Sequence, residues 1–196
     1  MRAVIDAVGP FTLCLERDRF GMLVRSIISQ QISTSAARSI RRRLHELAGP
    51  ESVTPAWLSD LTVDQLRSVG LSPQKANYIA DLARKVSDGT VELRQIGRLS
   101  DERIVTHLTQ VKGIGRWTAQ MFLIFSLGRL DVFPHDDLGV RTAIRNRYGL
   151  ADLPDKQTAI TIAAPWRPFA SVASWYCWRT LDLDRKTEMV TRGYPT

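Results

Sequence analysis

The chain of 196 residues is 44% hydrophobic and 24% charged, which is an ordinary balance for a folded domain and argues against intrinsic disorder. Its net charge is +7, and 22 of its 27 basic residues are arginine. This excess favours a polyanionic partner, because neutralised phosphates release counterions. No apolar run reaches the roughly 18 residues of a membrane helix, and the first residues carry no apolar signal core. We therefore expect a cytoplasmic protein (nucleoid-associated if it is bacterial) with no membrane partner.

The two cysteines, Cys14 and Cys177, are far apart, and each has apolar or aromatic neighbours. Neither a close pair nor a group of four is present that could form a zinc site, a thiol redox motif or an iron–sulfur ligand set. We therefore expect both cysteines in the core and no required cofactor.

Helical periodicity and capping signals run through the first half of the chain. Serine and threonine stand at the predicted helix starts, proline often follows them, and glycine stands at the stops. In order, the predicted features are a helix over residues 20–30, a helix from Ser33 to Gly49-Pro50, a short helix after Thr54-Pro55, a capping box at Thr62 and Gln65 with a stop at Gly70, and a helix from Ser72-Pro73 to Gly89.

The second half is also helical. Ser100 is placed to cap a helix that Gly113-Ile114-Gly115 interrupts. The next helix, from about Trp117 to Leu127, is apolar on nearly every face, so we expect it to be the buried central helix. Three more helices are expected over residues 138–148, 156–164 and 168–182. No alternating strand pattern longer than four or five residues occurs, so the predicted fold class is all-α.

Residues 108–119, Leu-Thr-Gln-Val-Lys-Gly-Ile-Gly-Arg-Trp-Thr-Ala, hold two glycines two positions apart between predicted helices. Such a turn leaves backbone N–H groups pointing outwards at the start of the next helix, where they suit a phosphate. We expect phosphate contacts from Lys112, Gly113, Gly115, Arg116 and Thr118. The alternative is an ordinary helix–helix turn with glycine caps.

Val111 to Ala119 resembles the hairpin of the helix-hairpin-helix DNA glycosylases, and Arg116-Trp117 within it is similar to the 3-methyladenine DNA glycosylase II family. The resemblance spans roughly residues 9–182. It implies two helical lobes with the active-site cleft between them. One lobe would comprise residues 1–20 plus 131–196, and the other residues 21–130, with the helix-hairpin-helix motif at about 104–127.

Two details of the hairpin follow from the resemblance. The family usually has proline where this chain has Lys112. In the family, main-chain carbonyls of the hairpin also hold a sodium or potassium ion, and by position these would be the carbonyls of Thr109, Val111 and Ile114.

Asp136 and Asp137 lie directly before the helix predicted at 138–148, where adjacent aspartates are most often helix caps. Val132-Phe133 and Asp137-Leu138-Gly139-Val140 resemble a family segment in which the aspartate before Leu-Gly-Val is catalytic. The resemblance implies Asp137 as the catalytic carboxylate, with Asp136 as the fallback. A fixed anion stabilises positive charge that develops on the deoxyribose, and it can orient the attacking water.

The resemblance also places Trp117, Phe169, Met121, Leu138 and Gln30 around the base. Trp117 would offer an electron-rich face to a cationic alkylated purine. Plain core packing is the alternative for this residue. Bifunctional relatives carry a lysine nucleophile at this position, so tryptophan implies simple hydrolysis.

Ile28 to Ser33, Ile-Ser-Gln-Gln-Ile-Ser, resembles the family's Gln-Gln-hydrophobic-Ser turn, which enters the minor groove. By position Gln31 would be the wedge that fills the gap left by a flipped nucleotide. The alternative is that both glutamines are ordinary surface residues.

The resemblance thus implies a monomeric, monofunctional enzyme that flips a 3-methyladenine-type base out of damaged double-stranded DNA. It would hydrolyse the N-glycosidic bond and leave an abasic site for base excision repair. A non-catalytic helix-hairpin-helix module that only anchors DNA is one alternative. A related glycosylase for another lesion, such as uracil or hypoxanthine, is a second, and an unrelated all-helical interaction protein is a third.

Overall fold

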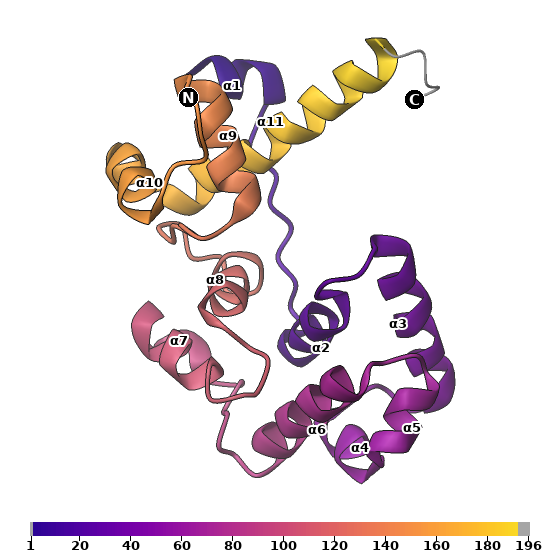
Figure 1. Ribbon diagram of the computed structural model, residues 1–196. Coiled ribbons are helices and arrows are strands. Elements are labelled where there is room, and N and C mark those ends of the chain that lie inside the picture. The colour runs from indigo at the N-terminus through magenta and orange to yellow at the C-terminus, as the bar shows by residue number, and fades with distance from the viewer. Residues whose placement is uncertain (1, 192–196) are drawn as a thin grey trace. The chain divides into compact units, whose positions relative to one another are not determined.

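The computed structural model describes the backbone of residues 2–191 and the side chains of residues 2–184 (Figure 1). Every regular element in this part of the chain is helical, which confirms the all-α prediction. The helices form two compact units. One contains the described residues through Leu15 together with those from Gly128 onwards, and the other is Glu16–Leu127.

The Glu16–Leu127 unit contains α2 (Arg19–Ser29), α3 (Thr34–Ala48), α4 (Pro55–Asp60), α5 (Val63–Ser68), α6 (Pro73–Ser87), the 3₁₀ turn η1 (Ile96–Arg98), α7 (Asp101–Leu108) and α8 (Arg116–Phe125). Helix α6 packs against α2, α4 and α5, and α8 packs against α2 and α7. The side chains with almost no exposed surface include Leu23, Ile27, Leu82 and Phe122. Residues 118–124 of α8 are all buried, as expected for the central helix.

Local capping chemistry sets most helix starts in this unit. Ser33, Thr54 and Ser72 each occupy an N-cap position and accept a hydrogen bond from a first-turn N–H group. Both halves of the capping box between Thr62 and Gln65 are present. Ser100 also stands at the N-cap of its helix, but its side chain makes no capping bond within the described chain.

The other unit contains α1 (Arg2–Val8), α9 (Leu138–Tyr148), α10 (Lys156–Ala163), the 3₁₀ turn η2 (Ala164–Trp166) and α11 (Ala170–Thr191). Helix α11 packs against α1 and α9. The core of this unit includes a cluster of Val140, Ala143, Ile144, Ala159 and Cys177. The short elements α1, η1 and η2 were not predicted, because three to seven residues carry too little periodicity to be recognised.

The boundaries of the units differ from the expected 20/21 and 130/131. Glu16 belongs to the unit of α2 and α8 because its N–H donates to the Phe125 carbonyl at 2.8 Å and its carbonyl accepts from the Ser126 hydroxyl at 2.9 Å. Arg19 is anchored to the same unit through the Leu93 carbonyl, at 2.6 Å. Backbone and side-chain hydrogen bonds, rather than composition, decide where this segment belongs.

The prediction that both cysteines are buried is wrong for Cys14. This residue is exposed in the irregular segment between α1 and α2. Cys177 is buried in the core of its unit, and that burial, together with the nearby charge of Asp137, raises the pKa of its thiol to about 12. Cys177 is therefore an unreactive core residue.

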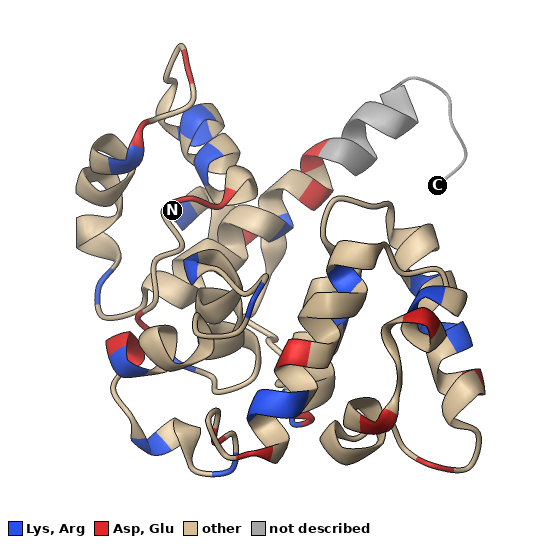
Figure 2. Ribbon diagram, turned by 60° about the horizontal axis from the view of Figure 1, so that its bottom comes forward, with Lys and Arg blue, Asp and Glu red and all other residues tan. Residues whose placement is uncertain are grey.

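The described helices include none with the length and apolar character needed to cross a membrane. Lysine and arginine residues are spread over helices of both units (Figure 2). The basic excess is therefore not the property of a single tail or helix.

Candidate active site

The hairpin between α7 and α8 takes its shape from Gly113. This residue has a φ of +81°, which a side chain disfavours, and a Cβ added to it would lie 2.0 Å from the Tyr78 ring. The N–H of Lys112 donates to Asp81 Oδ2 at 2.9 Å, and the Gly113 carbonyl accepts from Gln30 Nε2 at 2.8 Å. Both the backbone conformation and the packing on α6 therefore require glycine at position 113.

The start of α8 is open to an anion. Gly115 is the N-cap residue, and no described side chain caps this helix. A Cβ built on Gly115 would meet no described atom within 4 Å. First-turn N–H groups have no partner within their own helix, and the helix dipole favours negative charge at this end. The hairpin thus offers the backbone donors and the space that a phosphate requires.

The side chains expected to bind phosphate differ in their availability. Lys112 is exposed. Arg116 is also exposed and pairs with both carboxylate oxygens of Glu102. Such a surface pair contributes only about 0–1 kcal/mol, so a phosphate can replace the carboxylate. Thr118, the third residue of α8, is only 4% exposed, and the phosphate contact expected of it stays a prediction.

The turn between α2 and α3 is strained and braced. Gln31 is exposed and has a φ of +55°, a conformation uncommon for residues with a side chain. The Lys75 ammonium donates to the Ile28 carbonyl at 2.7 Å and also to the Gln30 carbonyl. Burial lowers the pKa of Lys75. The expected wedge residue therefore stands on a turn whose carbonyls are fixed by a lysine of α6.

A cavity of about 540 Å³ adjoins this turn and the start of α8. Its lining includes Met22, Gln30, Gln31, Arg41, Trp117 and Met121. Trp117 is 43% exposed, so plain core packing is excluded for this residue. The Glu16–Leu127 unit thus brings together four of the residues that sequence reasoning assigned to the base pocket and the wedge. The volume lies within the range of small-molecule sites.

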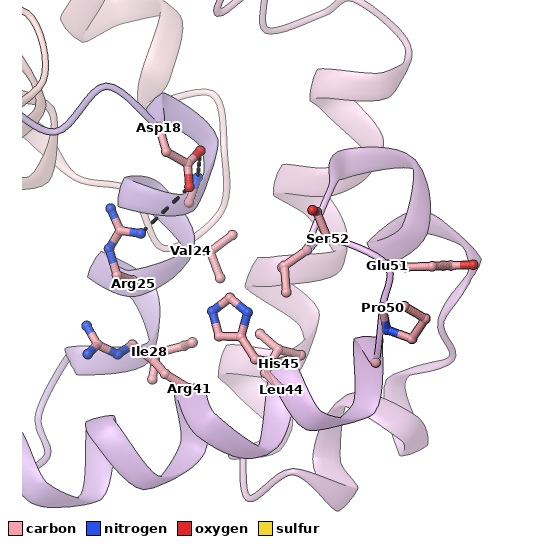
Figure 3. A pocket seen from close by; sticks show the side chains of 13 residues that line it. Asp18, Val24, Arg25, Ile28, Arg41, Leu44, His45, Pro50, Glu51 and Ser52 are labelled. Atoms are coloured by element: carbon pink, nitrogen blue, oxygen red, sulfur yellow. Dashed lines mark hydrogen bonds and ion pairs between the residues drawn. The ribbon is translucent and has the colours of Figure 1, made fainter.

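A second cavity, of about 410 Å³, lies between α2, α3 and the loop at residues 49–53 (Figure 3). Arg25 and Arg41 line both cavities. Arg25 is neutralised by Glu16 at 2.6 Å and by Asp18 at 3.7 Å. Arg41 forms no hydrogen bond or ion pair with a described residue. Its guanidinium is therefore an uncompensated cation beside the Trp117 cavity.

In the other unit, Asp137 is the N-cap residue of α9 and is only 8% exposed. Its Oδ1 accepts hydrogen bonds from the Val140 N–H at 2.8 Å and from Trp178 Nε1 at 2.8 Å. The neighbouring Asp136 is exposed, and its Oδ1 lies 3.1 Å from His135 Nδ1. Two donors from different helices fix the direction of the Asp137 carboxylate, whereas Asp136 takes no part in the cap.

Gly139 makes room for the indole that reaches Asp137. A Cβ on Gly139 would lie 3.0 Å from Trp178 Cδ1 and 3.1 Å from Asp137 Oδ1, tighter than ordinary van der Waals contact. Trp178 is half-buried and packs against the core cluster, and its ring nitrogen also donates to the carboxylate. Close packing against Trp178 therefore explains why the Asp-Leu-Gly-Val segment has glycine at position 139.

The other two expected pocket residues of this unit, Leu138 and Phe169, are 64% and 53% exposed. Asp131 fixes the turn that carries Phe169. Its Oδ2 accepts from Arg167 Nε at 2.8 Å and its Oδ1 from the Ala170 N–H at 3.3 Å. Neither side chain is buried, so both are available to contact a ligand.

Comparison with known proteins identifies the family of the chain. Residues 24–168 match the HhH-GPD superfamily of base excision DNA repair proteins. The chain belongs to this superfamily. The match contains the hairpin, Trp117 and Asp137, and it ends one residue before Phe169.

Individual relatives agree with this assignment. The chain is 34% identical over 177 residues to DNA-3-methyladenine glycosylase 1 of Schizosaccharomyces pombe, covering 89% of this chain and 78% of that protein. It is 30% identical over 188 residues to a putative DNA-3-methyladenine glycosylase of Bacillus subtilis, covering 93% of this chain and 66% of that protein. The solved structure of the Schizosaccharomyces pombe 3-methyladenine DNA glycosylase in complex with abasic DNA has a TM-score of 0.82 at 33% identity, covering 91% and 89% of the two chains.

Several residues of this HhH-GPD chain that bear on the site were missed by sequence reasoning. Met22 and Arg41 line the cavity, Lys75 bonds the turn between α2 and α3, Asp81 bonds the hairpin and Trp178 bonds Asp137. None of them stands in a local sequence pattern that indicates this role. Their contacts join residues too far apart in the sequence for any local pattern to connect them.

Proposed function

We propose that this HhH-GPD protein is a monofunctional DNA glycosylase. It would flip a damaged base out of double-stranded DNA, hydrolyse the N-glycosidic bond and leave an abasic site for base excision repair. The observation that carries the proposal is Asp137, a nearly buried carboxylate fixed by two hydrogen-bond donors. The names of the relatives and the abasic DNA in the similar structure support the same activity.

The proposed role of Asp137 is to act on the deoxyribose during cleavage of the N-glycosidic bond. Cleavage of the N-glycosidic bond builds positive charge on the deoxyribose as the base leaves. A carboxylate that is already oriented stabilises this charge without reorganisation, and it can hold the attacking water. Asp136 remains the fallback.

For the base, we propose that alkylated purines of the 3-methyladenine type are the substrates. Trp117 presents an exposed indole on which an extruded base can stack. A cationic base gains about 0.5–2 kcal/mol from such a ring. Met121 and Gln30 share its cavity, and Phe169 and Leu138 are the further apolar residues assigned to the base.

We propose hydrolysis alone, without a lyase step. A lyase reaction requires an amine that forms a Schiff base with the sugar. The position after Arg116 is tryptophan, and the ammonium of Lys75 is engaged by two carbonyls. Water is the second substrate of the proposed hydrolysis, and we propose that no cofactor is required.

DNA would be held at two places in the Glu16–Leu127 unit. We propose that Lys112, Gly113, Gly115 and Arg116 bind a phosphate at the start of α8, and that Gln31 enters the duplex as the wedge. Both the binding hairpin and the carboxylate belong to one chain, so we propose that the protein acts as a monomer.

We further propose that the carbonyls of Thr109, Val111 and Ile114 hold a sodium or potassium ion. The Val111 carbonyl accepts the Ile114 N–H at 3.1 Å, and its second lone pair can serve a cation. If so, DNA affinity is higher in potassium or sodium salts than in tetramethylammonium salts of equal ionic strength.

Asp137→Asn tests the proposed function. In single-turnover release of 7-methylguanine from duplex DNA, we expect the variant to be at least about 100-fold slower, because one electrostatic group is worth roughly 3–4 kcal/mol. DNA binding should be retained. Asp136→Asn is the matched control and should keep its rate within about twofold, since exposed carboxylates contribute little. Full activity of Asp137→Asn would overturn the assignment, and DNA binding without any base release by the wild type would favour the anchoring module.

One observation favours a second candidate substrate. The uncompensated guanidinium of Arg41 beside Trp117 opposes a cationic base. A neutral deaminated purine such as hypoxanthine does not meet this repulsion. Parallel release assays with 7-methylguanine and hypoxanthine in the same duplex distinguish the two.

A further inference from the structure

Helix α6 is unusual in its use of lysine. The chain has 22 arginines and five lysines, and two of those lysines, Lys75 and Lys85, lie on α6. Both donate to main-chain carbonyls at turns outside the helix. A compact ammonium with three donors suits several carbonyls that converge on one point.

Lys75, in the first turn of α6, holds the turn at residues 28–33, here called the wedge turn. Its ammonium bonds the carbonyls of Ile28 and Gln30, where α2 ends. A cation at this end of a helix is also favoured by the helix dipole. Gln31, with its positive φ, follows directly. A residue in this conformation persists only where its surroundings fix it, and the lysine supplies that restraint.

Asp81, further along α6, holds the hairpin at residues 109–115. Its carboxylate accepts the Lys112 N–H at 2.9 Å and the Lys85 ammonium at 3.0 Å, and Lys85 also bonds the Gln110 carbonyl. Burial opposes the charge of Asp81, but the hydrogen bonds from Lys112, Lys85 and Arg84 outweigh it and keep the pKa of the carboxyl below its ordinary value.

The two turns are also joined directly. Gln30 of the wedge turn donates from Nε2 to the Gly113 carbonyl of the hairpin at 2.8 Å. Gly113 in turn lies against the ring of Tyr78 of α6, where no Cβ would fit. The wedge turn, the hairpin and α6 therefore form one hydrogen-bonded group, and α6 joins it through the side chains of Lys75, Asp81 and Lys85.

We propose that α6 is a positioning element that holds the wedge turn and the hairpin in one fixed register, with Lys75 and Asp81 as its positioning residues. This inference rests on the proposed function, in which the hairpin binds a phosphate while Gln31 displaces a nucleotide. Gln31 can displace a nucleotide only if it stays in a fixed position relative to the hairpin that binds the DNA backbone. Lys75 then affects the rate of base flipping, and Asp81 affects the affinity of the hairpin for DNA.

Lys75→Met tests the role of the wedge turn. The probe is a duplex with 2-aminopurine beside a 7-methylguanine, whose fluorescence rises when its neighbour is flipped out. We expect the flipping rate to fall by about fivefold or more while DNA affinity changes less than about threefold, since the hairpin keeps its own bonds. Lys156→Met, which removes an exposed lysine elsewhere, controls for the lost charge and should flip at the wild-type rate.

Asp81 is tested in two backgrounds that differ in one backbone donor. Lys112→Ala keeps the N–H at position 112, and Lys112→Pro removes it, while both lack the lysine charge. We expect Asp81→Ala to weaken DNA binding about fivefold in the Lys112→Ala background and less than about twofold in the Lys112→Pro background, because the bond it removes is already absent there. Equal losses in both backgrounds would overturn this role of Asp81.

The same samples separate this inference from the proposed function. Wild-type flipping by Lys75→Met, with its unfolding temperature unchanged, overturns the positioning role of Lys75 alone. Base release measured in parallel tests catalysis. A wild type that binds and flips DNA but releases no base contradicts the proposed function and leaves the positioning role standing.

Discussion

Trp178→Phe removes one of the hydrogen bonds that orient Asp137. The indole Nε1 donates to Oδ1 at 2.8 Å, and phenylalanine keeps an aromatic ring at this place in α11 without the donor. The Val140 N–H remains as the other donor, at 2.8 Å. The carboxylate therefore keeps its cap bond and loses its restraint from the neighbouring helix.

The size of the effect follows from the kind of bond. A hydrogen bond to a charged group contributes about 1.5–3 kcal/mol. The carboxylate carries its charge both before and during bond cleavage, so most of this energy is common to the ground state and the transition state and does not affect the rate. What Trp178→Phe removes is part of the restraint on the orientation of the Asp137 carboxylate. We expect a roughly tenfold slower reaction, equivalent to about 1.4 kcal/mol.

Single-turnover release of 7-methylguanine at saturating enzyme measures this effect without product release. Trp175→Phe is the matched control, because Trp175 lies on the same helix and packs against Phe11 and Tyr176 without bonding Asp137. Thermal unfolding of both variants monitors stability. A wild-type rate for Trp178→Phe, or a loss as large as that of Asp137→Asn, would refute the reasoning.

Three further substitutions test other parts of the site. Gly139→Ala puts a Cβ 3.0 Å from the indole, so we expect a similar, about tenfold, loss in the same release assay. Gly113→Ala combines a φ of +81° with an overlap against α6 and should lower the free energy of unfolding by about 2–4 kcal/mol in urea titrations. Arg41→Gln should reduce the slope of log affinity against log salt by about 0.9 if its guanidinium meets one phosphate. Arg42→Gln, on the same helix but paired with Glu46, should leave that slope nearly unchanged.

The parts of the fold that follow from short sequence patterns were predictable. The capping box that starts α5 joins Thr62 and Gln65, which are only three positions apart, so a short sequence pattern is enough to predict it. The same is true of the hairpin, where a left-handed backbone at position 113 requires glycine. The pairing of Gln30 with Trp117 in one cavity came instead from the family resemblance, because no periodicity links two positions so far apart.

The contacts that fix the site were not predictable from the sequence. Trp178 reaches Asp137 across 41 positions, and Lys75 reaches Ile28 across 47. On its own helix each of these residues looks ordinary, one as a core tryptophan and the other as a surface lysine. Which groups they meet depends on how the helices of a unit pack, and that is a property of the tertiary structure. Cys14 was misassigned for the same reason, since apolar neighbours do not bury a residue of an irregular segment.

The two interpretations of Asp137, helix cap and catalytic anion, describe the same geometry. The bond to the Val140 N–H that makes it a cap also removes the rotational freedom a catalytic group must lack. The helix N-terminus attracts negative charge, which favours a nearly buried carboxylate at this position. Asp136 has the same chemistry one residue earlier, but it is exposed and outside the cap. Any difference between Asp136→Asn and Asp137→Asn must therefore come from position alone, and the cap is what sets that position.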